Sequence, residues 1–155
     1  MAISKLGVSD KWVELASSSP TSGSTVTFSS LPEYRDYKLI VFDADLSGSA
    51  NFQCRFNNDS GNNYAYALDA GSSVVSGSPA SSILFGDASA NNFIELTILG
   101  ANEPVKEINS WYASVGNDGI AKGFWNDAAI INRIDVVLST GTFSSASLKV
   151  YGRNR

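Results

Sequence analysis

The sequence predicts an all-β protein, an antiparallel two-sheet sandwich with a jelly-roll-like arrangement. Three observations support this prediction. Short runs of alternating apolar and polar residues recur along the chain, as in strands with one buried face. Turns rich in Gly, Ser, Asn and Pro separate the runs, and no window has the apolar spacing of a three-turn amphipathic helix. At 155 residues and 43% hydrophobic, the chain is the size of one domain that can bury a core.

The clearest strand signal is the alternation of Phe52, Cys54 and Phe56 with polar residues. A turn of Asn, Asp, Ser and Gly follows, and a second alternating run begins at Tyr64. We expect about nine or ten strands in total. Their expected positions are residues 12–15, 25–28, 38–46, 52–57, 64–68, 82–85, 93–99, 105–115, 130–138 and 148–151.

Turn chemistry is expected between these strands, at residues 76–79, 100–104, 116–119 and 139–142. Residues 32–37 and 126–129 are candidates for a single helical turn each. In the strand at 38–46, Ile40 and Phe42 are expected to face the core, with Leu39 and Val41 on the other face. The core side chains predicted from period-two placement are Phe28, Ile40, Phe42, Cys54, Phe56, Ile134, Val136 and Val150. We expect residues 1–11 to be an N-terminal arm and residues 12–155 to be a single sandwich domain.

The composition of the chain argues against some classes of binding partner. Only 17% of residues are charged, the net charge is −4 and the pI is near 4.7. No cluster of Lys or Arg offers the basic stripe that neutralises nucleic-acid phosphates, so no nucleic-acid binding is expected. The N-terminal residues lack the apolar segment of a signal peptide, and no apolar run approaches a membrane span. A low-charge β protein rich in Ser, Asn and Gly is typical of secreted, cell-surface or virion proteins.

The sequence indicates a protein that is not an enzyme and that carries no cofactor. Its 155 residues include no histidine, which excludes Ser-His-Asp and Cys-His catalysis and the ordinary zinc sites. No glycine-rich phosphate loop opens a helix. A glycosidase needs only two carboxylates, and Asp43 and Asp45 are spaced for one strand face, but acidic residues on a solvent face are ordinary. The lone cysteine, Cys54, is interpreted as a small buried apolar residue.

Calcium is the one metal that the sequence raises as a possibility. Asn57, Asn58, Asp59 and Asn62 supply oxygen atoms within one loop. Their spacing does not match the twelve-residue calcium loop, and the same residue types stabilise turns through their own hydrogen bonds. No metal site is therefore predicted.

A candidate interaction surface comes from aromatic and apolar residues. Two adjacent aromatic pairs lie in strand-like segments, so one ring of each pair should face each side, and exposed rings are platforms for sugars and for protein interfaces. In the arm, apolar residues alternate with polar ones and could dock on a neighbouring subunit or a capsid lattice, or fold back on their own sandwich. The predicted set is Ile3, Leu6, Val8, Trp111, Tyr112, Phe124 and Trp125.

Several motifs follow one another in an order that resembles a domain of bacteriophage virion proteins, the β-sandwich terminal domain of tail fibres. The first motifs are Trp12-Val13-Glu14-Leu15 and the segment from Val26 through Leu31-Pro32 to Tyr37. The next is Arg55-Phe56-Asn57-Asn58-Asp59-Ser60-Gly61-Asn62-Asn63-Tyr64. The last are Trp125-Asn126-Asp127-Ala128-Ala129-Ile130-Ile131-Asn132-Arg133-Ile134, Gly141-Thr142-Phe143 and Leu148-Lys149-Val150-Tyr151-Gly152.

The resemblance covers nearly the whole chain and implies a β-sandwich displayed on a virion, commonly as a homotrimer, with no catalytic residue. A tail fibre normally has a long attachment region and shaft, whereas here the domain begins about a dozen residues from Met1. A standalone copy is expected to dock directly on the particle. Capsid decoration, with the major capsid protein as partner, is the first expectation. The alternative is a tail-fibre or tail-tip receptor-binding module, with a tail component and a host-surface glycan as partners.

Overall fold

The structure is a computed structural model that describes residues 11–71, 73–88, 92–114 and 117–154. Every regular element in these residues is a β-strand, and the strands form two antiparallel sheets. The predicted all-β sandwich is therefore confirmed. The strands are β1 (Val13–Ser18), β2 (Thr25–Phe28), β3 (Asp36–Leu46), β4 (Ala50–Phe56), β5 (Tyr64–Asp69), β6 (Val74–Ala80), β7 (Ile83–Ala88), β8 (Phe93–Leu99), β9 (Val105–Ser114), β10 (Asn117–Asn126), β11 (Ile134–Leu138) and β12 (Phe143–Arg153).

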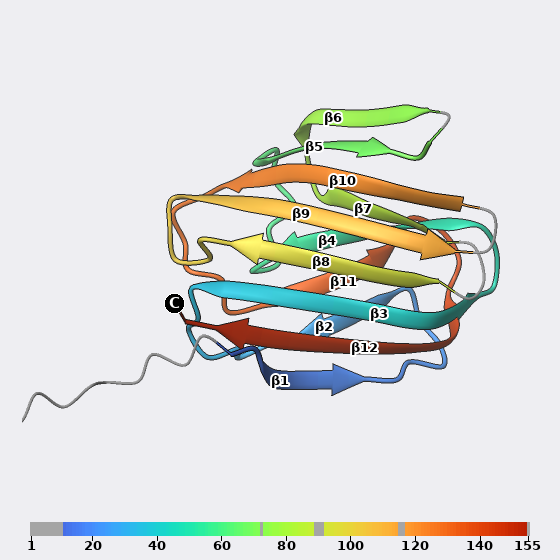
Figure 1. The fold of residues 1–155 in the computed structure, drawn as a ribbon, viewed down its shortest axis with the longest axis horizontal. Coiled ribbons are helices and arrows are strands. Elements are labelled where there is room, and N and C mark those ends of the chain that lie inside the picture. The colour runs from blue at the N-terminus through green and yellow to red at the C-terminus, as the bar shows by residue number, and fades with distance from the viewer. Residues whose placement is uncertain (1–10, 72, 89–91, 115–116, 155) are drawn as a thin grey trace, which may run out of the picture.

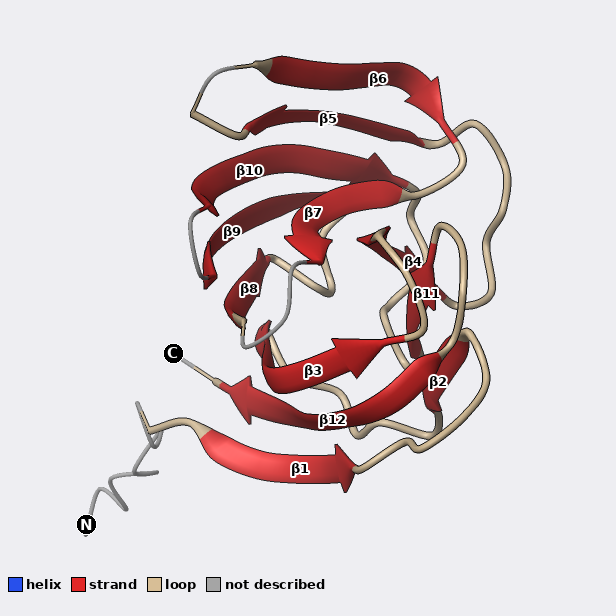
Figure 2. Cartoon of the chain, turned by 90° about the vertical axis from the view of Figure 1, so that its right-hand side faces the viewer, coloured by secondary structure: helices blue, strands red, loops and turns tan. Residues whose placement is uncertain are grey.

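The two sheets differ in width (Figure 1). The larger has eight strands in the order β1-β12-β3-β8-β9-β10-β5-β6, and the smaller has four in the order β2-β11-β4-β7. The chain crosses between them repeatedly, which gives the jelly-roll-like connectivity. Figure 2 shows the larger sheet curving around the smaller one, so that its concave face covers the core and its convex face is the outside of the molecule.

The core lies between the sheets and contains most of the predicted residues. Phe28, Cys54, Phe56, Ile134, Val136 and Val150 are all buried. The prediction for Ile40 and Phe42 was wrong, because both are half-buried on the outer face while Leu39 and Val41 are fully buried. Both faces of β3 are apolar, so alternation alone did not identify the inner one. An irregularity at Asp43, whose φ is 51°, then returns Ala44 to the core.

Two strands were not predicted. The segment Ser76-Gly77-Ser78-Pro79 has turn residues but lies within β6. Gly77 faces the ring of Tyr66 there, and a Cβ at Gly77 would lie 2.7 Å from the Tyr66 Cε1. The expected turn at 116–119 likewise overlaps the start of β10. The predicted helical turns at 32–37 and 126–129 are wrong, since neither range contains helix. Residues 127–133 form a loop, and the strand expected from residue 130 begins at Ile134.

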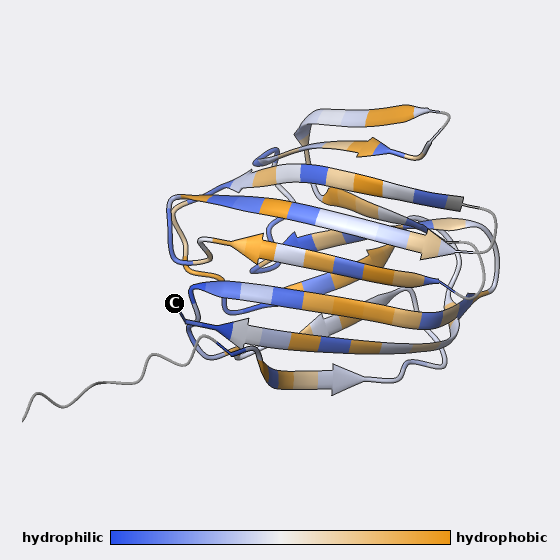
Figure 3. Ribbon diagram, in the orientation of Figure 1, coloured by the Kyte–Doolittle hydropathy of each residue, from blue (hydrophilic) through white to orange (hydrophobic). Residues whose placement is uncertain are grey.

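Hydrophilic and hydrophobic residues alternate along several strands of the larger sheet (Figure 3). No helix in the described part of the chain is long and apolar enough to cross a membrane. The arm expected at residues 1–11 falls almost entirely outside the described residues, so the division into arm and domain stays a prediction.

The inner face of β3 can be tested with two neighbouring substitutions. Leu39→Ala removes a fully buried side chain and should lower the free energy of unfolding by about 2–5 kcal/mol. Ile40→Ala, on the half-buried outer face, should cost about 1 kcal/mol. Urea denaturation of the two variants and the wild type measures both values. An equal or larger loss for Ile40→Ala would contradict this side-chain assignment.

Candidate binding surface

The hydrogen bonds of Asp59 hold together the end of the sandwich at which β4 and β10 finish, called here the Trp125 end. The Asp59 carboxylate accepts hydrogen bonds from the Trp125 indole N–H (2.7 Å), the Gly61 backbone N–H (2.8 Å) and the Asn63 side-chain amide (3.0 Å). Partial burial alone would raise the pKa of Asp59, but these three donors outweigh it and hold the pKa below its ordinary value. The loop after β4 is thereby fixed to β10.

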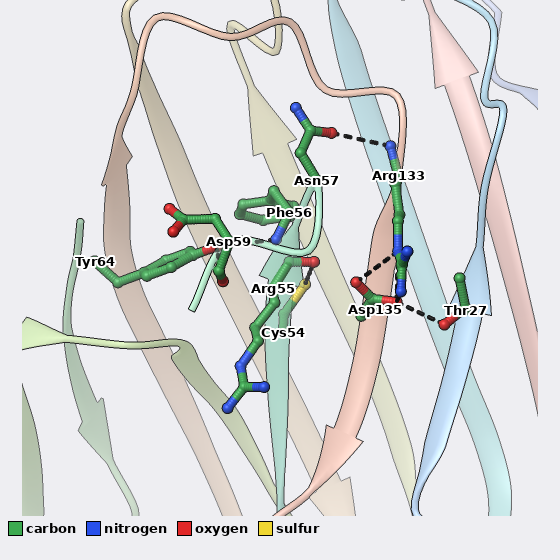
Figure 4. Close-up of polar contacts among 9 residues, drawn as sticks. All are labelled: Thr27, Cys54, Arg55, Phe56, Asn57, Asp59, Tyr64, Arg133 and Asp135. Carbon is green, nitrogen blue, oxygen red and sulfur yellow. Dashed lines mark hydrogen bonds and ion pairs between the residues drawn. The ribbon is translucent and has the colours of Figure 1, made fainter. Parts of the chain in front are cut away.

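Tyr64 closes the same loop from inside (Figure 4). Its hydroxyl donates to the Asp59 carbonyl (3.1 Å) and accepts from the Phe56 backbone N–H (3.0 Å), so one side chain joins both halves of the loop. Burial raises the pKa of Tyr64 far above its ordinary value. The ring also stacks against Trp125, with centroids 6.1 Å apart and planes 16° from parallel. The Asn-rich segment from Asn57 to Asn63 is therefore a structural loop.

Asn57 links this loop to residues 127–133. Its φ is 52°, a left-handed conformation that asparagine tolerates well. Its side-chain oxygen accepts from the backbone N–H groups of Asn132 (3.0 Å) and Arg133 (3.2 Å), and its amide donates to the Ile130 carbonyl (2.8 Å). Figure 4 shows Asn57 reaching Arg133, which in turn binds Asp135 (2.9 Å). The oxygens considered as calcium ligands at Asn57 and Asp59 are thus hydrogen-bond acceptors within the protein.

A buried lysine fixes the second loop. Lys106 on β9 is fully buried, and its ammonium donates to the carbonyls of Asp127 and of Ala129 (2.6 Å for Ala129). It also lies 4.7 Å from the centroid of the Trp125 ring, a cation–π contact. Burial lowers the pKa of Lys106. Two of the motifs that carry the resemblance, residues 55–64 and 125–134, therefore meet at the Trp125 end, where they stabilise the fold.

The structure divides the predicted interaction residues into exposed and buried ones. Trp111 and Phe124 are 46% and 49% exposed, whereas Tyr112 and Trp125 are each 1% exposed. The last two are core residues, so their place in the predicted surface is a correction. The physical reason is strand alternation, which turns one ring of each adjacent pair inward. Ile3, Leu6 and Val8 lie outside the described residues.

The exposed rings stand at the two ends of a shallow groove on the outer face of the larger sheet. Three adjoining hollows along β9, β10 and β5 form this groove, with volumes of about 440, 220 and 470 Å³. Neighbouring hollows share Asp69, Ile120, Ala67 and Lys122 in their walls. Trp111 pairs with Ile120 across the strands, and Phe124 is four residues farther along β10. The two rings are thus about 13 Å apart along the sheet.

Each end of the groove has a distinct chemistry. At one end the Trp111 ring rests on Phe93, with centroids 5.0 Å apart, and Asp69 and Asp118 line the adjoining hollow. Toward Phe124 the lining is mostly apolar, and Glu107, Asn109 and Lys122 add polar groups to it. The Asn109 amide donates to Glu107 (2.9 Å). The small side chains of Ala65 and Ala67 form part of the floor of the hollow beside Phe124.

Sequence reasoning identified the rings at the ends of the groove but missed Ile120, Lys122 and Asn109. The first two lie in β10, which was not recognised as a strand. Alternation along β9 predicts that the Asn109 side chain points outward. The residues that lie beside it depend on the register between neighbouring strands, which the pattern of one strand does not show.

The candidate catalytic and reactive groups do not come together. Asp43 and Asp45 are both exposed near the end of β3. Among the described residues, no three His, Cys, Asp or Glu side chains are grouped so that they could hold a metal ion. Cys54 is fully buried, and desolvation, followed by the nearby Asp135 carboxylate, raises the pKa of its thiol well above the ordinary value. What the arrangement offers is a surface for binding.

The Asp59 cluster should make stability pH-dependent. Since its folded pKa is depressed, Asp59 contributes stability above its unfolded pKa, near 3.9, and this contribution is lost as pH falls through the folded value. Asp59→Asn should lower the free energy of unfolding by on the order of 1 kcal/mol at neutral pH. Its difference from wild type should shrink when urea denaturation is repeated below about pH 3. Asp45→Asn, at an exposed carboxylate, is the control; a pH-independent difference for Asp59→Asn would contradict the assignment.

Comparisons with known proteins do not identify a family for this chain. No protein-family model and no curated protein matches the chain. Among solved structures, the chain is similar to the exo-inulinase from Aspergillus awamori, with 11% sequence identity and a TM-score of 0.48. The match covers 90% of this chain and 29% of the inulinase chain, so the chain spans less than a third of that enzyme's length. At this level the likeness says nothing about activity.

Proposed function

We propose that this protein is a non-catalytic structural component of a bacteriophage virion, which docks on the head surface through the outer face of its larger sheet. One observation carries the proposal: exposed large hydrophobic side chains gather on this face. They are Val74, Val105, Trp111, Ile120 and Phe124. Monomeric proteins rarely expose contiguous apolar surface without an interaction that covers it.

The chemistry of the face suits a protein lattice as its occupant. Aromatic anchors surrounded by smaller apolar and amide groups are typical of the centre of protein interfaces. With 17% charged residues in the chain, docking should rely on apolar and amide contacts and depend weakly on salt. The resemblance to phage virion domains supports the choice of particle. Its motifs at residues 55–64 and 125–134 have structural roles at the Trp125 end, which leaves the sheet face free for contacts.

The first test locates the protein on virions of the phage that encodes it and measures docking by variants. Cryo-electron microscopy should show many copies on the head. Purified protein added to heads that lack it should bind and replace the missing copies. When the added protein is limiting, Trp111→Ala or Phe124→Ala should reduce occupancy of the heads by more than about tenfold. Val13→Ala, at a residue 45% exposed on β1, should dock like wild type. Absence from the virion, or full occupancy by both ring variants, would overturn the proposal.

A second candidate function is glycan recognition by a tail component, and the polar middle of the groove favours it. Asn109 and Lys122 lie between the two exposed rings, and Glu107 lies beside Phe124. Aromatic rings with one apolar face available, accompanied by amide, carboxylate and ammonium groups, can stack on and hydrogen-bond a chain of sugar units. The groove joins both features over about 13 Å.

Asn109→Ala separates the two functions, because it removes a hydrogen-bonding group and leaves both rings in place. Titration calorimetry with polysaccharide purified from the host surface measures glycan affinity. Glycan recognition predicts a loss of about fivefold or more for Asn109→Ala and a larger loss for Trp111→Ala. Head docking predicts that Asn109→Ala reduces occupancy less than either ring variant does. No heat of binding for wild type across the host polysaccharides would exclude the glycan candidate.

A further inference from the structure

The two sheets end in four edge strands among the described residues, and three of these edges are protected against pairing. Exposed strand edges are ready templates for another strand, and proteins protect them with charge, bulges, short length or cover. β1 has an irregular register at Glu14, which also forms an ion pair with Lys149 (3.1 Å). β2 is only four residues long. β7 lies beneath the larger sheet, where the Ser110 hydroxyl donates to the Phe85 carbonyl (2.7 Å).

On β6 such protection is confined to the second half, where the register with β5 is irregular between Gly77 and Ala80 and where Pro79 lies. The first half, residues 74–77, pairs with β5 in regular register and contains no charged residue. It pairs with β5 on one side and forms the outermost strand of the curved sheet in Figure 2. Figure 3 shows it without the deeply hydrophilic colour seen on β3, β9 and β10.

Both faces of β6 are uncovered as well as its edge. Val74 is 68% exposed and its neighbour Val75 is 44% exposed, although adjacent residues of a strand point to opposite faces. The strand thus extends beyond the layer of core packing. Two β-branched residues in this setting have high strand propensity and leave apolar surface that another strand would cover.

We infer that β6 is a self-association edge, at which two copies of this chain pair antiparallel across a two-fold axis near Ser76. In this arrangement Ser76 faces Ser76 of the second copy, and the valines of each strand reach toward Ser78 and Gly77 of the other. The two larger sheets then form one continuous sheet.

The chemistry of β6 favours a second copy over an unrelated strand. A two-fold axis places each residue opposite its own neighbours, so a strand with no charge meets its copy without repulsion. Ser76 and Gly77 are small, so they leave room for the second strand near the axis. The position that a Gly77 Cβ would take is occupied by the Tyr66 ring of the same copy. Pairing would also cover the exposed Val74 and Val75. The result is an even-numbered assembly, in contrast to the homotrimer that the resemblance implies.

Association at β6 would have a functional effect beyond the single docking face. β5, which is next to β6, and β10, which is next to β5, form part of the groove wall. Pairing would therefore bring the grooves of two copies onto one face, only a few strands apart. Two linked binding faces bind a repetitive surface more tightly than one.

Charge placed at the axis tests the inference. Ser76→Lys and Ser76→Glu each put like charges directly opposite one another across the two-fold axis. Sedimentation equilibrium at high micromolar concentration should show a dimer for wild type. Each variant alone should have a dimer dissociation constant raised about tenfold or more, and an equimolar mixture of the two should regain the dimer. Circular dichroism and thermal unfolding verify that both variants are folded.

The matched control is Ser17→Lys, at an exposed serine on the opposite edge strand, β1, which should dimerise like wild type. Trp111→Ala should also dimerise, which separates this inference from the proposed docking function. A monomeric or trimeric wild type would overturn the inference. So would undiminished association of Ser76→Lys, or an equimolar mixture that stays monomeric.

Discussion

The difference in width between the two sheets is the constraint on which the rest of the structure depends. A sheet of eight strands packs on a sheet of four, and stacked sheets are stable only where their inner faces are covered. Curvature lets the larger sheet wrap the smaller one (Figure 2), but it leaves a broad convex face and an outermost strand, β6, with little beneath it. The exposed rings and the partly unprotected edge therefore have one architectural origin.

The Trp125 end holds in place the irregular loops that connect strands of the sandwich. Loop backbone groups near a core need hydrogen-bond partners, and here Asp59, Asn57 and Lys106 supply many of them. Asn57 and Asp59 belong to one of the sequence motifs that carry the resemblance, whereas Lys106 lies outside these motifs. The motifs therefore report on how the fold is held together, and the binding chemistry lies on strands whose sequence is less distinctive.

How far the sequence predicted the structure depended on the local pattern. Strands with clean alternation, such as β2 and β8, were predicted with their observed bounds, and the adjacent aromatic pairs correctly implied one exposed ring each. β3 was assigned to the wrong face because both of its faces are apolar. β6 and β10 were missed because turn residues lie inside paired strands, where sheet hydrogen bonds override local preference. The groove depends on the register of β9, β10 and β5, which no single-strand pattern contains.

The position of β12 has a consequence for how the chain reaches this structure. β12 lies between β1 and β3 in the larger sheet, and its Tyr151 hydroxyl meets Glu14 across 137 residues of sequence. The small sheet likewise joins Thr27 to Asp135, 108 residues apart. Chain closure over such separations is slow, so folding should take milliseconds to seconds rather than microseconds. During synthesis β1 cannot pair with β12 until the end of the chain has been made. The early strands therefore lack their final neighbours until synthesis is complete.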